Sequence, residues 1–92
     1  MNSENQNQNS NRFVTDLLPL VSVLHYFNFP VLSISQKSPR HAYFEFADTE
    51  KLRDTSNRYW NGELLVEPKR FFATIKEIKA RLYGQVDEPK NL

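Results

Sequence analysis

Cysteine is absent from the 92-residue sequence, and glycine occurs only twice. Without cysteine the chain has no disulfide, no thiolate metal site and no cysteine nucleophile. Two glycines are too few for the glycine-rich loop that cradles a phosphate group. The longest apolar run, residues 17–24, includes Pro19 and Ser22 and is too short to cross a bilayer. Because the first twelve residues are almost wholly polar and resemble no signal peptide, we expect a soluble cytoplasmic protein.

Residues that catalysis or metal binding would need are also scarce. The two histidines, His25 and His41, stand sixteen positions apart, and we interpret both as structural or incidental. Asp48, Glu50 and Asp54 lie near the expected start of a helix, where acidic side chains cap the helix and oppose its dipole. We therefore expect no enzyme, no catalytic residue, no cofactor, no metal and no small-molecule substrate.

Length and composition predict one small domain with a limited core. Hydrophobic residues make up 39% of the chain and aromatic residues 13%. Residues 1–12 are nearly all polar, and we predict a disordered tail there, with a first strand at Phe13 and Val14 as the alternative. The predicted domain spans residues 13–84, and residues 85–92 are a second polar tail.

Apolar and polar side chains alternate along residues 41–46, which is the pattern of a strand buried on one face only. Residues 31–36 show the same alternation, and residues 37–40 between them have the composition of a turn. The two strands are therefore predicted to form an antiparallel hairpin. Residues 64–66 are either a third strand that widens the sheet or an extended connector, and we favour the strand.

The apolar residues also predict the register of the hairpin. With Leu32 opposite Phe46 and Ile34 opposite Phe44, all four apolar side chains lie on one face. The other face is then open to solvent or to a partner. It carries Ser33, Ser35, His41, Tyr43 and Glu45.

Three helices are expected to cover the apolar face of the hairpin. The first spans residues 17–27 and is apolar around most of its circumference, with Thr15-Asp16 at its start and Asn28 as a left-handed end. The second begins at Asp48, its predicted N-cap, and ends near residue 61.

The last helix, residues 68–83, has the clearest helical pattern. Pro68 suits its first position, and Gly84 is expected to end it. Its apolar stripe consists of Phe71, Ile75, Ile78 and Leu82. The predicted fold class is thus α+β, a small single domain of order α-β-β-α-(β)-α, with an antiparallel hairpin covered by three helices.

One flank of this last helix combines basic and aromatic side chains. At about 100° per residue, five side chains fall beside the apolar stripe: Lys69, Phe72, Lys76, Lys79 and Tyr83. Such a flank suits phosphate contacts and base stacking. The simpler interpretation is that the lysines are solvated and their stems shield the edge of the core, in line with a net charge of only +1.

Residues 40–46, Arg-His-Ala-Tyr-Phe-Glu-Phe, partly resemble the central strand motif of RNA-recognition domains. That family presents rings on the outer face of the strand for base stacking, and a helix and a short strand follow it. The resemblance implies that His41 and Tyr43 would stack on bases. The motif's glycine and its leading basic residue are out of register in this sequence.

A second resemblance covers residues 13–83 and depends on the order and spacing of ordinary motifs. They are Thr15-Asp16-Leu17, Tyr43-Phe44-Glu45-Phe46, Asp48, Tyr59, Asn61-Gly62-Glu63, Val66, Pro68, Ile75-Lys76, Ile78-Lys79 and Leu82-Tyr83. In these the chain resembles a family of short prokaryotic and phage domains known as a domain of unknown function. The resemblance implies a shared fold and a phage or mobile-element setting, and it implies no activity.

The leading functional hypothesis is a non-catalytic interaction module that binds another protein, or a second copy of itself, and no membrane. The hairpin edges and the outer face around Tyr43 are the expected contact surfaces. The alternative is a nucleic-acid-binding protein that uses the basic flank of the last helix, with His41 and Tyr43 as stacking groups.

Overall fold

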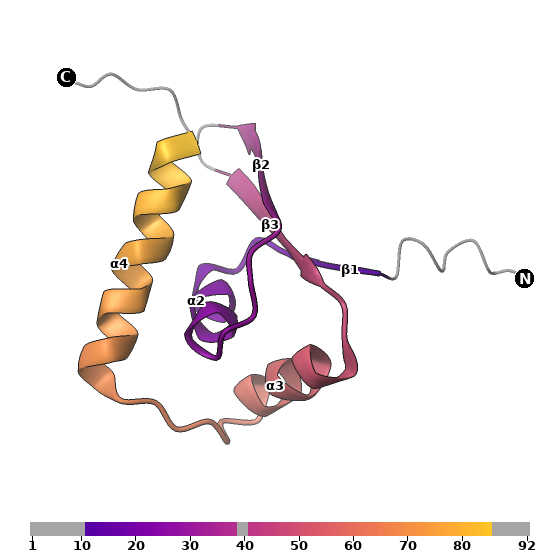
Figure 1. Cartoon of the computed structure of the whole chain (residues 1–92), viewed down its shortest axis with the longest axis vertical. Coiled ribbons are helices and arrows are strands. Elements are labelled where there is room, and N and C mark those ends of the chain that lie inside the picture. Colours follow the sequence, from indigo (N-terminus) through magenta and orange to yellow (C-terminus); the bar gives the residue numbers. More distant parts are fainter. Residues whose placement is uncertain (1–10, 39–40, 86–92) are drawn as a thin grey trace, which may run out of the picture.

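The computed structural model describes residues 11–38 and 41–85. Its elements are β1 (Arg12–Thr15), α2 (Leu18–Tyr26), β2 (Ser33–Ser38), β3 (His41–Ala47), α3 (Glu50–Trp60) and α4 (Pro68–Gln85). Three antiparallel strands and three helices confirm the predicted α+β class. Figure 1 shows α2 in the middle of the domain, with the sheet, α3 and α4 around it. Of the predicted tails, residues 1–10 and 86–92 lie outside the described residues, as do residues 39–40 of the predicted turn.

β3 is the central strand of the sheet, and β1 and β2 are its antiparallel edge strands. Phe44 pairs with Ile34 of β2 and with Thr15 of β1, so the predicted register of Ile34 and Phe44 is confirmed. The register of β2 shifts between Gln36 and Ser38. This irregularity carries β2 two residues further than the sequence predicts, into the expected turn.

The start of β2 also differs from the prediction. Val31 is buried, whereas Leu32 is 46% exposed. The Leu32 backbone N–H still donates to the Glu45 carbonyl oxygen at 2.7 Å, but the strand itself begins at Ser33. The prediction that Leu32 lies in the core opposite Phe46 is therefore wrong, because the chain that follows Pro30 turns Val31 inward instead.

The third strand of the sheet is β1, and the predicted strand at residues 64–66 is wrong. Those residues belong to an irregular connector between α3 and α4, where Leu65 is 90% exposed. β1 instead places Phe13 beside Phe46 of the central strand. The alternative of a first strand at Phe13 is thus confirmed, and that strand begins at Arg12, within the segment assigned to the tail.

α2 is buried along most of its length, as its apolar composition predicts. Its buried residues are Leu20, Val21, Ser22, Val23, Leu24 and Tyr26. Pro19 lies in the first turn, where the amide that proline lacks would have no partner within the helix. Asn28 has a φ of 73°, so the predicted left-handed end of this helix is confirmed.

Thr49, and not Asp48, is the N-cap of α3. The Thr49 hydroxyl accepts the Leu52 backbone N–H at 3.1 Å, the usual capping bond to the third helical position. The Asp48 carboxylate instead accepts a hydrogen bond from Arg53 Nε at 2.9 Å. The predicted cap is therefore wrong by one residue, since both side chains are good caps and the backbone geometry decides between them.

α4 begins at Pro68, as predicted, and the Glu67 carboxylate caps it. Its two oxygens accept the backbone N–H groups of Lys69 at 3.1 Å and Arg70 at 2.7 Å. The prediction that Gly84 ends this helix is wrong, because α4 continues to Gln85. A glycine ends a helix only where the backbone turns left-handed, and the left-handed glycine of the described chain is Gly62, after α3.

One hydrophobic core joins the sheet to all three helices. It is formed by Leu20, Val21, Leu24, Val31, Ala42, Phe44, Phe46, Leu52 and Ile78. Phe44 and Phe46 are its largest side chains and are almost completely buried. α3 contributes Leu52 and α4 contributes Ile78, and Tyr59 and Leu82 of the same two helices pack against the core.

Replacing Phe44 with alanine is expected to lower the free energy of unfolding by about 3–5 kcal/mol, because a buried ring is lost and leaves a cavity. Chemical denaturation monitored by circular dichroism measures this change. Leu65→Ala, at an exposed apolar position, is the matched control and is expected to cost less than about 0.5 kcal/mol. An unchanged midpoint for Phe44→Ala would show that β3 is assigned wrongly.

Thr49→Ala is expected to destabilise the domain by about 1 kcal/mol, because the first turn of α3 loses its side-chain cap. Thr49→Ser keeps the hydroxyl and should restore most of that stability. Equilibrium urea unfolding compares the two variants. If they lose the same amount, the hydroxyl is not the cap.

Candidate functional site

The outer face of the sheet is uncovered, as the alternation along β3 predicts. Figure 1 shows the three helices on one side of the sheet. On the other side, the predicted outer-face residues are exposed or half-buried: Ser33, Ser35, His41, Tyr43 and Glu45. This face is one candidate contact surface.

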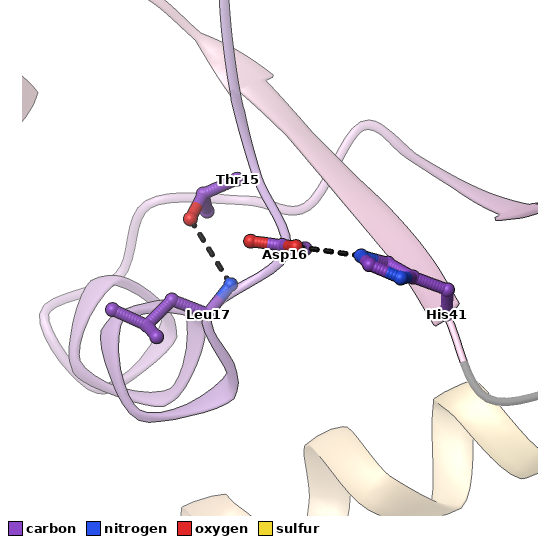
Figure 2. A network of polar contacts seen from close by, with 4 residues as sticks. All are labelled: Thr15, Asp16, Leu17 and His41. Atoms are coloured by element: carbon purple, nitrogen blue, oxygen red, sulfur yellow. Dashed lines mark hydrogen bonds and ion pairs between the residues drawn. The ribbon is translucent and has the colours of Figure 1, made fainter.

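The two rings of the outer face already have partners. The rings of His41 and Tyr43 stack with their centroids 5.1 Å apart and an interplanar angle of 22°. His41 Nε2 lies 2.7 Å from Asp16 Oδ2, beside the turn in which the Thr15 hydroxyl accepts the Leu17 N–H at 3.1 Å (Figure 2). This network fixes the link between β1 and α2 against the start of β3.

Carboxylates make the outer face a poor match for a nucleic acid. Asp16 stands beside His41, and Glu45 accepts a hydrogen bond from the Ser33 hydroxyl at 3.0 Å. Negative side chains repel phosphate groups, and ring faces that stack on each other are less open to a base. The geometry therefore gives no support to base stacking by His41 and Tyr43.

A second candidate surface, the α4 flank, is defined by Lys69, Phe72, Lys76, Lys79 and Tyr83. All five residues are exposed, and the two rings strongly so, Phe72 by 64% and Tyr83 by 63%. The flank lies on a helix that covers the inner side of the sheet, whereas His41 and Tyr43 lie on the outer face. The five residues of the α4 flank therefore lie along one side of the helix, and His41 and Tyr43 do not belong to the same surface.

An apolar groove borders the α4 flank. It lies between α2 and α4, has a volume of about 120 Å³, and is lined by Leu18, Pro19, Ser22, Phe71 and Ile75. Ile75 is half-buried, and at about 100° per residue it lies at the edge of the apolar stripe that is nearest to the flank. Apolar surface therefore continues from this groove toward the exposed rings.

A larger cleft, the α2–α4 cleft, lies on the other side of α4. Its volume is about 480 Å³, and His25, Arg70 and Glu77 are among its lining residues. His25 Nε2 lies 3.4 Å from Glu77 Oε1, and the Arg70 guanidinium stands 4.1 Å from the centre of the Tyr26 ring. Sequence reasoning missed this cleft. The sequence feature that could have indicated it is the seven-residue spacing of Arg70 and Glu77, which places both on one side of the helix.

The described residues offer neither a metal-binding cluster nor a helix that could span a membrane. Residues 11–38 and 41–85 contain no group of three or more histidine and carboxylate side chains able to hold a metal ion. Within the same ranges, no helix combines the length and the apolar character needed to span a membrane.

Residues 10–84 match a domain of unknown function, DUF5659. The chain belongs to this family. The match covers β1, both strands of the hairpin and all three helices to Gly84. No curated protein and no solved structure matches the chain.

The α4 flank of this DUF5659 domain should contribute little to stability. Lys76→Glu combined with Lys79→Glu is expected to change the free energy of unfolding by less than about 1 kcal/mol, because both side chains are exposed. Ile78→Ala, between them on the buried side, should cost about 2–5 kcal/mol. Thermal or urea unfolding of the two variants checks this contrast, and comparable losses would mean that the flank is structural.

Proposed function

We propose that this DUF5659 domain is a non-catalytic module that binds an acidic protein partner through the α4 flank and the adjoining apolar groove. The observation that carries the proposal is the exposure of Phe72 and Tyr83 on a helix side that holds three lysines and no carboxylate. The proposed contact surface is therefore on α4, whereas the sequence alone favoured the hairpin edges and the outer face around Tyr43. The prokaryotic or phage setting and the cytoplasmic location remain predictions from the sequence.

The spacing of the two rings supports a helix that docks in a groove. Phe72, Lys76, Lys79 and Tyr83 follow one another at i, i+4, i+7 and i+11, the pattern of anchor residues in helix-in-groove recognition. Over eleven residues the helix rises by about 16 Å. Large aromatic side chains often dominate binding energy because they remove much apolar surface from water. The partner would therefore offer two apolar pockets about that far apart.

The charge of the flank supports an acidic partner over a second copy of the same chain. Lys69, Lys76 and Lys79 are positive, and two such flanks brought face to face would repel each other. An acidic surface between the two apolar pockets would complement them. Binding of this kind is expected to weaken as salt screens the exposed charges.

Nucleic acid is the alternative ligand for the same lysines. The apolar groove beside the flank has no evident use in phosphate binding, and the chain as a whole carries a net charge of only +1. Binding to phosphates depends on many cationic contacts. These observations favour a protein, and nucleic acid becomes an outcome of the test.

Photo-crosslinking from the flank tests the proposal. The full chain carrying Phe72→p-benzoylphenylalanine is irradiated in a nuclease-treated lysate of the source organism, with Leu65→p-benzoylphenylalanine as the control at another exposed apolar position. A discrete acidic protein is expected to crosslink from position 72 only. Lys76→Glu with Lys79→Glu should abolish this product, whereas Lys51→Glu, an exposed lysine of α3, should not.

Four results would contradict the proposal. The first is the same products from positions 65 and 72, and the second is a product that survives the reversal of both lysines. The third is a gel shift of single-stranded or duplex probes that those reversals remove, with no protein crosslink, which would establish the nucleic-acid alternative. A homodimer lost with Phe72→Ala would equally rule out a different protein as the partner.

A further inference from the structure

We propose that the α2–α4 cleft binds an elongated zwitterion, of which a short peptide with free termini is the simplest example. The site is separate from the α4 flank and does not depend on the function proposed for it. At about 100° per residue, Arg70 and Glu77 project from α4 at least about 80° away from every residue of the flank. The cleft volume of about 480 Å³ lies within the usual range for small-ligand sites.

The guanidinium of Arg70 places a positive charge at one end of the cleft, where the Tyr26 ring holds it in position. The guanidinium stands 4.1 Å from the centre of the Tyr26 ring, and the Tyr26 hydroxyl in turn accepts the Glu67 backbone N–H at 2.9 Å. Within the described ranges the guanidinium forms no ion pair. A stacked guanidinium keeps its N–H groups free at the edge of its plane, where a carboxylate binds them in bidentate fashion.

Glu77 supplies the opposite charge at the other end. It contacts His25 at 3.4 Å, beyond ordinary hydrogen-bond length, and no other partner of its carboxylate occurs in the described chain. The same histidine has a buried Nδ1 with no hydrogen-bond partner. Buried polar atoms are rarely left unpaired, so this Nδ1 is an exception within the cleft, where the Thr74 hydroxyl donates to the Arg70 carbonyl oxygen at 2.9 Å.

The spacing of Arg70 and Glu77 along α4 sets the expected length of the ligand. Arg70 and Glu77 are seven residues apart on α4, a rise of about 10 Å. Three residues of extended peptide span about the same length. A tripeptide would therefore place its carboxylate at Arg70 and its ammonium at Glu77, with its body against Phe29, Pro30 and Ala73, which also line the cleft.

Titration of the 15N-labelled full chain with trialanine tests this site. Amide shifts are expected at residues 25–29 and 70–77, with saturation in the millimolar range. Acetylation of the peptide's amine or amidation of its carboxylate should each weaken binding by about tenfold, the loss of one charge-assisted contact. Arg70→Gln should remove the preference for the free carboxylate, and Glu77→Gln the preference for the free amine.

Arg81→Gln is the matched control, since Arg81 lies on α4 but does not line this cleft, and it should leave binding unchanged. No shifts at about 10 mM trialanine would overturn the proposal. Shifts that map to other residues would also overturn it. Equal binding of acetate, inorganic phosphate and trialanine would show a simple anion site instead. Because none of these outcomes involves the α4 flank, failure here is distinct from failure of the proposed function.

Discussion

Burial of the Phe44 and Phe46 rings is the interaction on which the rest of this structure depends. Both rings point from the central strand into the core and are 1% and 0% exposed. β1 and β2 hydrogen-bond to the two sides of the same strand, and α2 provides the apolar surface above it. Removing surface of this size from water is the largest stabilising contribution available to so small a domain.

A core centred on β3 also explains why much of the surface of α4 is exposed to solvent. The helix is 18 residues long, but it enters the core cluster through Ile78, with Leu82 packed against the edge. Only a stripe of a long helix can be covered by one neighbouring helix and the end of a strand. The remaining circumference is divided between the α4 flank on one side and the α2–α4 cleft on the other. Both proposed sites thus follow from the geometry of a small core and a long helix.

Local patterns predicted the parts of the fold that local physics determines. The alternation along residues 41–46, the pairing of Ile34 with Phe44, the left-handed Asn28 and the start of α4 at Pro68 all depend on neighbouring residues. The third strand was predicted only as an alternative to a disordered tail, because Phe13 and Val14 are a short apolar pair that is stabilised by pairing with β3, over thirty positions away. Residues 64–66 show the converse, since this apolar triplet pairs with no strand and stays irregular.

The sequence predicted one candidate site and not the other, again because only contacts within one element follow from local patterns. The α4 flank depends on helical spacing within one element, so the sequence identified its five residues. The α2–α4 cleft depends on how His25 of one helix meets Arg70 and Glu77 of another, which no spacing along the chain encodes.

Native-state hydrogen exchange, followed amide by amide, tests the central role of β3 most directly. The account predicts that the slowest amides lie in β3 and in the buried part of α2 and exchange only on global unfolding, while residues 64–66 of the connector exchange quickly. If the β3 amides exchanged as fast as those of the connector, burial of Phe44 and Phe46 would not be what holds this domain together.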